Sequence, residues 1–134
     1  MRCGKSVLAL AVSAVALVAI PVAPVFAGGG YDQTTDGGHV KWHAEGYGFY
    51  SSGPGAGGFH IWGTLTSDDD NSAHLNIGVA GYDPVTFHVD PHQSLYINQY
   101  VEEPGHDLPA SAWTEVCAEH WDGDDCSEKR HFYN

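Results

Sequence analysis

The stretch Phe59-His60-Ile61-Trp62-Gly63-Thr64-Leu65-Thr66 decides the fold class, because apolar and polar side chains alternate along it. Alternation with a period of two is typical of a β-strand that buries one face. Six more runs repeat the pattern, at 40–44, 75–79, 85–89, 95–101, 113–121 and 126–133, with turn-forming residues between them. The sequence therefore predicts an all-β fold, an antiparallel β-sandwich of about seven short strands, with a small β-barrel as the alternative.

The N-terminus has the three parts of a signal peptide in the expected order. Arg2 and Lys5 come first, the apolar run 7–20 follows, and the small-residue site Val25-Phe26-Ala27 precedes Gly28. The apolar run is shorter than the roughly 20 residues that a membrane-spanning helix needs. We therefore expect residues 1–27 to be a helical signal peptide that is removed when the protein is secreted.

Removal of the signal peptide would change the charge of the chain. We expect a flexible polar segment at 28–38 and a single β-domain at 39–134. Residues 28–134 together contain the cations Lys41, Lys129 and Arg130 and 17 acidic residues, a formal net charge of −14. Nucleic acids and anionic membranes bind proteins through Lys and Arg, so we expect neither as a partner. The same charge favours a soluble extracellular monomer.

Cys117 and Cys126 are the cysteines that remain after secretion. Disulfides form and persist outside the cytoplasm, and an even pair in a small secreted domain usually forms one bridge. We therefore predict a disulfide between Cys117 and Cys126 that clamps a C-terminal hairpin.

Around these cysteines, at Val116-Cys117 and Asp124-Asp125-Cys126-Ser127, the chain resembles the C-terminal hairpin of small exported proteins of high-GC Gram-positive bacteria. Those proteins are compact β-domains, mostly of unassigned function. The resemblance implies the fold and a secreted location, and it implies no mechanism.

Nine histidines and two acidic turns are the metal-ligating residue types of the sequence. The histidines are spaced as on strands; His39 and His43, for example, would lie on one face but roughly 13 Å apart. The acids of the two turns are Asp68, Asp69, Asp70, Asp122, Asp124 and Asp125. Neither turn has the spacing of a tight calcium loop. We therefore expect no cofactor and no metal site, with these six acids as weak candidates for calcium.

The sequence contains no G-x-S-x-G elbow, no H-E-x-x-H zinc helix and no glycine-rich phosphate loop. Glu115 and Glu119 would share one strand face about 13 Å apart, too far for a glycosidase carboxylate pair. Whether the protein is an enzyme is left undecided, and a non-enzymatic protein is favoured. The enzymatic alternative is a small secreted hydrolase that uses surface carboxylates.

Trp62, Tyr96 and Tyr100 fall opposite the apolar positions of their runs, as does Tyr82 if the strand at 75–79 extends that far. Rings on these faces either complete the core at corners and edges, which is the favoured interpretation, or form an exposed patch. Exposed aromatic rings provide contact area at little entropic cost and suit protein or carbohydrate partners. The sequence therefore favours a non-enzymatic binding module for an extracellular protein or carbohydrate, with these four residues as its site. A secreted inhibitor of an extracellular enzyme, presenting the loop 51–58, is the alternative.

Overall fold

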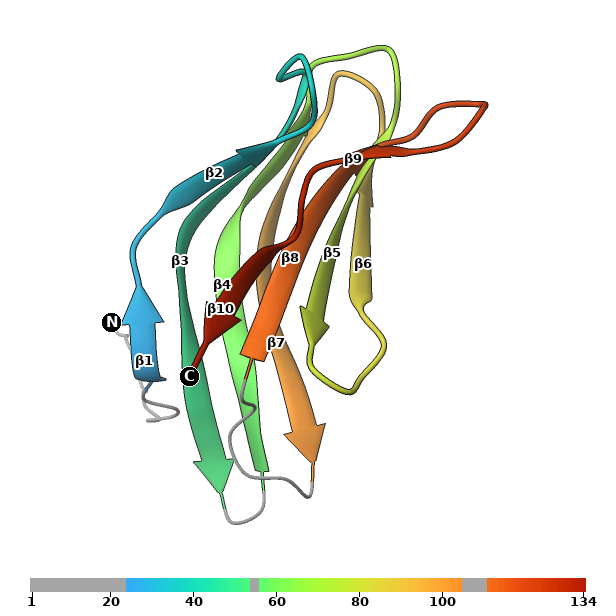
Figure 1. The fold of residues 1–134 in the computed structure, drawn as a ribbon. Helices are drawn as coiled ribbons and strands as arrows, with labels where there is room; N and C mark the ends of the chain where they lie inside the picture. The colour runs from blue at the N-terminus through green and yellow to red at the C-terminus, as the bar shows by residue number, and fades with distance from the viewer. Residues whose placement is uncertain (1–23, 54–55, 105–110) are drawn as a thin grey trace, which may run out of the picture.

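The computed structural model describes residues 24–53, 56–104 and 111–134, which form ten β-strands in two layers (Figure 1). The strands are β1 (Pro24–Gly28), β2 (Tyr31–Thr34), β3 (Val40–Gly53), β4 (Ala56–Ser67), β5 (Ala73–Val79), β6 (Val85–Val89), β7 (Ser94–Pro104), β8 (Ser111–Ala118), β9 (Asp125–Cys126) and β10 (Arg130–Tyr133). None of the described residues belongs to a helix long and apolar enough to cross a membrane.

The strands pair into two five-stranded antiparallel sheets, which lie face to face (Figure 1). Sheet A has the order β1-β3-β4-β7, and β2 also pairs with β3; sheet B has the order β10-β8-β5-β6, and β9 also pairs with β8. The predicted antiparallel sandwich is confirmed. It has more strands than expected because β1 and β2 show no alternating pattern and because the run 126–133 divides into β9 and β10.

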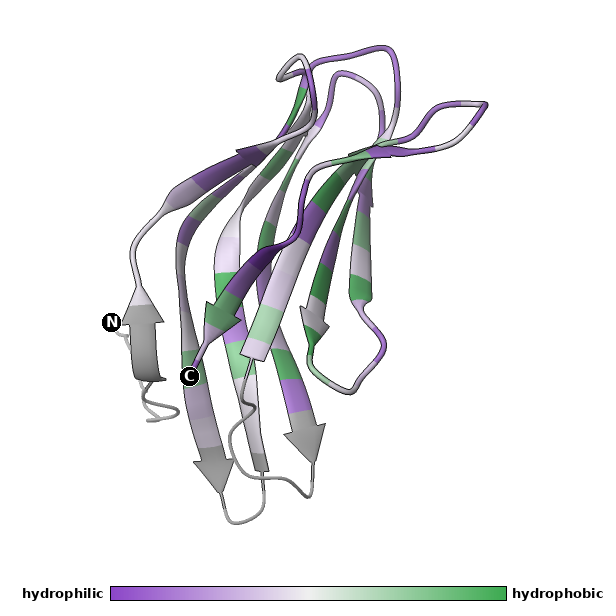
Figure 2. Cartoon of the chain, in the orientation of Figure 1, coloured by the Kyte–Doolittle hydropathy of each residue, from purple (hydrophilic) through white to green (hydrophobic). Residues whose placement is uncertain are grey.

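The core lies between the sheets and is built from the residues that the alternation predicts to face inward. The largest fully buried side chains include Trp42, Phe49, Phe59, Ile61, Leu65, Leu75, Ile77 and Val116. Figure 2 shows the corresponding alternation of hydrophobic and hydrophilic residues along the strands. Burial of each large apolar side chain stabilises the fold by about 1.5–3 kcal/mol.

The expectation of a flexible polar segment at 28–38 is wrong for residues 31–34. Tyr31–Thr34 forms β2 and pairs with β3 in the register Tyr31↔Ala44 to Thr34↔Lys41. Gln33 and Thr35 are buried. Polar composition was a poor guide here because a buried polar side chain is tolerated where the protein supplies its hydrogen bonds.

A chain of hydrogen bonds joins β2 of sheet A to sheet B. Trp42 Nε1 donates to Tyr31 Oη (3.1 Å), Tyr31 lies 2.7 Å from Thr114 Oγ1, and Thr114 Oγ1 donates to Gln33 Oε1 (2.8 Å). Gln33 Nε2 in turn donates to the carbonyls of Thr114 (2.9 Å) and Glu128 (2.7 Å). Burial raises the pKa of Tyr31 to about 12, although the hydrogen bonds with Thr114 and Trp42 act to lower it. The neutral phenol is therefore part of the folded structure.

We predict that this network makes the protein sensitive to alkali. The folded pKa of Tyr31 is about 12, above the ordinary tyrosine value of 10.0, so the unfolded chain loses the proton first as pH rises. The stabilisation is fully present below pH 10 and is lost as pH rises through 12, by up to about 2–3 kcal/mol. Urea unfolding of the wild type and of Tyr31→Phe across this range measures the effect. The stability difference between the two should shrink as pH rises, and a constant difference would contradict the prediction.

The predicted disulfide is confirmed. Cys117 and Cys126 lie directly opposite each other in the β8–β9 pair, and their sulfur atoms are bonded. The bridge holds β9, which has only two residues, against the end of β8. It therefore fixes the loop between these strands.

We predict that reduction of this disulfide lowers the melting temperature but leaves the protein folded. The closed loop is short, so the chain-entropy model gives a loss of about 2–3 kcal/mol. Cys117 is buried, but the large apolar side chains of the core and the Gln33 network do not depend on the bridge. Calorimetry with and without reductant measures the shift. The double variant Cys117→Ser/Cys126→Ser should melt at the temperature of the reduced wild type, and reductant should not change its melting temperature. If the reduced wild type or the double variant is unfolded at room temperature, the bridge holds the whole domain together.

Part of the predicted signal peptide lies in the described structure. Residues 1–23 are outside the described residues, whereas 24–27 belong to β1, which pairs with β3 near Tyr47 and Gly48. Cleavage after Ala27 would remove four of the five β1 residues and leave this edge of β3 unpaired. The disulfide is consistent with an extracellular location.

Candidate functional site

The outward side chains of β4 and β7 in sheet A form one continuous face, here called the β4–β7 face. Because the two strands pair in register, opposite residues alternate between the core and this face. The side chains that point outward belong to His60, Trp62, Thr64, Thr66, Ser94, Tyr96, Asn98, Tyr100 and Glu102. The set contains one carboxylate, that of Glu102 at its end beside Tyr100, and no lysine and no arginine.

Three rings stack in a row across this face. The centroids of Trp62 and His60 lie 4.5 Å apart with 27° between the ring planes, and those of His60 and Tyr100 lie 3.9 Å apart with 3° between the planes. The edge-to-face pair of Tyr50 and Tyr100 extends the cluster at 5.2 Å. Tyr50 is buried, whereas Tyr100 is 46% exposed. Tyr100 therefore offers the accessible ring surface of the row.

Hydrogen bonds and a glycine hold the row in place. His60 Nε2 lies 2.6 Å from Asn98 Oδ1, so the imidazole is fixed between its two aromatic neighbours. The Trp62 ring lies over Gly46, where any Cβ would collide with it. Gly46 follows a register shift in β3 after Ala44, which brings a residue without a side chain under the indole.

The structure places three of the four predicted binding residues on one face. Trp62, Tyr96 and Tyr100 lie on the β4–β7 face, and Tyr96 is 55% exposed. Tyr82 does not join them, because β5 ends at Val79 and Tyr82 lies in the following turn, in sheet B. The sequence analysis missed His60 and Asn98. Their positions on outward registers were readable, but the pairing of β4 with β7, which are separated by two strands in the sequence, was not.

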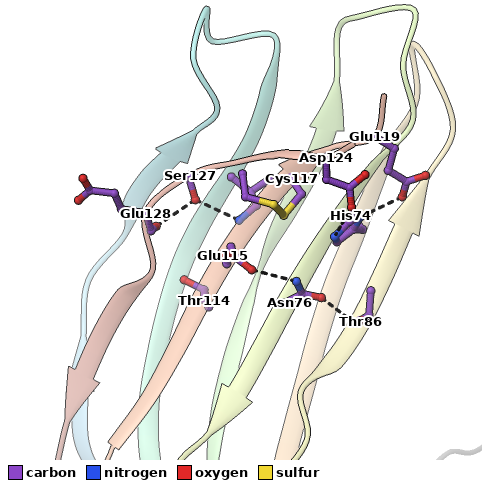
Figure 3. The surroundings of a disulfide bond; sticks show 12 residues. His74, Asn76, Thr86, Thr114, Glu115, Cys117, Glu119, Asp124, Ser127 and Glu128 are labelled. Carbon is purple, nitrogen blue, oxygen red and sulfur yellow. Dashed lines mark hydrogen bonds and ion pairs between the residues drawn. A yellow bond between two sulfur atoms is a disulfide. The ribbon is translucent and has the colours of Figure 1, made fainter. Parts of the chain in front are cut away.

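A second cluster lies on the outward face of sheet B. His74 of β5 lies directly opposite His88 of β6, and both rings donate from Nδ1 to the same oxygen, Glu119 Oε2, at 3.0 and 3.1 Å. Their Nε2 atoms also face carboxylates, His88 at 3.3 Å from Asp90 Oδ1 and His74 at 3.9 Å from Asp124 Oδ2. Figure 3 shows His74 between Glu119 and Asp124, beside the disulfide.

Within this cluster, His88 and Glu119 shift each other's pKa. For His88, the hydrogen bond to Glu119 raises the pKa, and the smaller contribution of Asp90 adds to it against the cost of desolvation. For Glu119, burial acts to raise the pKa, but the hydrogen bonds from His74 and His88 outweigh it, so the pKa is lowered. An imidazole that faces a carboxylate at both ring nitrogens, as His88 does, can donate a hydrogen bond to each of them only when it is protonated.

The acids proposed as weak calcium ligands do not act as one group. Asp69 accepts hydrogen bonds from Asp70 N and Asn71 Nδ2, and both lower the pKa of its carboxyl group, the first more than the second. Asp70 faces His92 at 2.8 Å, and Asp124 faces His74. These three carboxylates are therefore held by different neighbours.

Among the described residues, the sulfur atoms of Cys117 and Cys126 also come close to a carboxylate of Glu115. Both sulfur atoms belong to the disulfide, and Glu115 accepts a hydrogen bond from Asn76. This group is therefore a structural contact in the oxidised protein, since only a thiolate binds metal strongly.

In comparisons with known proteins, no family model, curated protein or solved structure matches this chain. The chemistry of the two faces is therefore the basis for the functional argument.

We predict that Gly46→Ala displaces Trp62 and destabilises the protein. The added Cβ would collide with the indole, and relief of such overpacking costs about 1–3 kcal/mol. Tryptophan fluorescence and thermal melting measure the two effects. Gly29→Ala is the control, because a Cβ there meets nothing within 4 Å. If the two variants have the same fluorescence and the same melting temperature, the position of Trp62 does not require a glycine at position 46.

Proposed function

We propose that the secreted domain is a non-catalytic carbohydrate-binding module whose ligand lies along the β4–β7 face. The observation that supports this most is the chemistry of that face. Eight of its nine outward side chains are aromatic, hydroxyl, amide or imidazole groups, and the ninth is Glu102 at one end, in a chain with 17 acidic residues. A surface with a single carboxylate on so acidic a protein favours an uncharged partner over a basic one.

Neutral sugars fit this chemistry. The C–H face of a sugar ring packs on an aromatic ring, and its hydroxyl groups pair with hydroxyl and amide side chains, which donate and accept. Tyr96 and Tyr100 supply exposed rings, and Asn98 lies between them on the same strand face. The two tyrosines are about 13 Å apart along β7, so a ligand that contacts both is an oligosaccharide or polysaccharide chain.

The face is also organised in advance of binding. His60 is stacked on both sides and hydrogen-bonded to Asn98, and Thr66 Oγ1 lies 3.0 Å from Ser94 Oγ. Side chains that are already ordered lose little conformational entropy when a ligand binds. This favours binding by a rigid platform.

The alternatives have less support. The loop 51–58, proposed as the exposed element of an inhibitor, is largely strand, because β3 continues to Gly53 and β4 begins at Ala56. The carboxylates of Glu115 and Glu119, proposed for a hydrolase, are engaged by Asn76 and by His74 and His88.

Affinity electrophoresis against a panel of neutral and acidic polysaccharides tests the proposal, followed by calorimetry with oligosaccharides of any that retards the protein. We expect a neutral glycan to bind, and Tyr100→Ala and Tyr96→Ala each to weaken binding by about tenfold or more, as for anchor residues of other interfaces. Tyr133→Ala is the matched control, because Tyr133 is 68% exposed but lies on β10 of sheet B.

Three results would contradict the proposal. These are no retardation by any glycan, an equal loss of affinity in Tyr133→Ala, and a preference for polyanionic glycans. Capture of a protein by the β4–β7 face, lost in Tyr100→Ala, would identify a protein-binding module instead.

A further inference from the structure

We infer that His74, His88 and Glu119 form a binding site for a zinc-class divalent cation, with Asp90 and Asp124 orienting the two imidazoles. The site lies on sheet B, away from the β4–β7 face of sheet A, so it is independent of the proposed carbohydrate binding. It differs from the calcium candidates of the sequence analysis in its donor set. Two imidazoles and a carboxylate suit zinc, copper or nickel, whereas calcium prefers oxygen ligands alone.

Two of the three distances between the donor atoms are close to those of a tetrahedral site. With metal–ligand bonds of about 2.0–2.1 Å, two ligand atoms on a tetrahedral zinc lie roughly 3.4 Å apart. Glu119 Oε2 is 3.0 Å from His74 Nδ1 and 3.1 Å from His88 Nδ1, so two of the three edges are nearly formed. The third edge, between the two Nδ1 atoms, is longer, because the three donor atoms do not all lie within 4.8 Å of one another. Binding of a cation therefore requires the ring of His88, whose side chain is 52% exposed, to turn toward His74.

The strand pairing places the imidazoles correctly for this movement. His74 and His88 are direct cross-strand neighbours, and such residues have Cβ atoms about 4.5–5.5 Å apart. Two imidazoles at that separation on the same face of a sheet can reach one ion. Glu119 follows directly after β8, and its backbone N–H donates to Ser72 O at 2.8 Å, which fixes the carboxylate above the pair.

The outer groups match the usual surroundings of a histidine bound to metal. A ligating imidazole commonly donates its other N–H to a carboxylate, which fixes the tautomer and the orientation of the ring. Here Asp90 faces Nε2 of His88 and Asp124 faces Nε2 of His74. When Nδ1 binds the cation, the imidazole proton is carried on Nε2, which faces a carboxylate at hydrogen-bond distance in His88 (3.3 Å) and at ion-pair distance in His74 (3.9 Å).

The charge around the cluster also favours a cation. The loops 35–39, 68–72, 90–93 and 119–124 lie at the same end of the sandwich (Figure 1), and together they contain eight acidic residues and neither lysine nor arginine. Lys129 and Arg130 lie instead over the rings of Trp113 and Tyr31. No fixed positive charge from these two residues competes for the site, and the acidic loops raise the local concentration of divalent cations.

Calorimetric titration of the chelator-treated protein with zinc chloride tests the inference, with Co²⁺ as a spectroscopic probe of tetrahedral coordination. We expect one zinc per chain, and a loss of affinity of more than about tenfold in each of His74→Ala, His88→Ala and Glu119→Gln, with about tenfold in Asp90→Asn. His43→Ala is the matched control, since His43 is also an exposed histidine bonded to a single carboxylate, Asp32, at 2.6 Å. Circular dichroism confirms that each variant is folded.

The inference is overturned if no saturable binding occurs at millimolar zinc. It is equally overturned if the double variant His74→Ala/His88→Ala binds zinc as the wild type does, because binding would then be spread over the other histidines. Since the variants do not touch the β4–β7 face, glycan binding in the same proteins separates a failure of this site from a failure of the carbohydrate proposal.

Discussion

The register between β4 and β7 is the constraint on which both faces of sheet A depend. Phe59 lies opposite Val101 in the core, and His60 lies opposite Tyr100 on the surface. Because side chains alternate with a period of two, a slip of one residue would expose Phe59 and bury His60. The burial of Phe59 and Ile61, both fully inaccessible, opposes such a slip. The stacking of His60 on Tyr100 is therefore a consequence of how the core packs.

The polar network around Gln33 joins the two sheets. It links β2, near the start of the described chain, to Thr114 in β8 and to Glu128 just before β10. Each buried donor and acceptor in it finds a partner, which is the condition for a buried polar group not to destabilise the fold. The disulfide adds a second tie, between β8 and β9. Together they hold the loop from which Glu119 and Asp124 project.

The outward faces of the two sheets carry different chemical groups, but in each sheet a tryptophan ring packs on a glycine. On sheet A, Trp62 lies on Gly46; on sheet B, Trp113 lies on Gly78, with Lys129 Nζ 4.1 Å above the ring. Beyond these tryptophans, sheet A presents hydroxyl, amide and aromatic groups, whereas sheet B presents histidines and carboxylates. Large rings on glycines keep both faces rigid. An uncharged ligand and a cation can therefore be bound on separate sheets without competing for the same groups.

By itself the sequence determined the all-β class, the apolar registers of β3 to β7, the disulfide and the positions of Trp62, Tyr96 and Tyr100 opposite those registers, because these follow from local periodicity and from a count of cysteines. The pairing of His74 with His88 could also be predicted from the sequence, because a β5–β6 hairpin centred on Gly81 places these two residues opposite each other. Only the tertiary structure decided that Gln33 is buried, that His60 stacks between Trp62 and Tyr100, and that Glu119 meets both histidines. Each of these depends on which distant strands pair and in which register, and that is set by packing of the whole core, which no local pattern records.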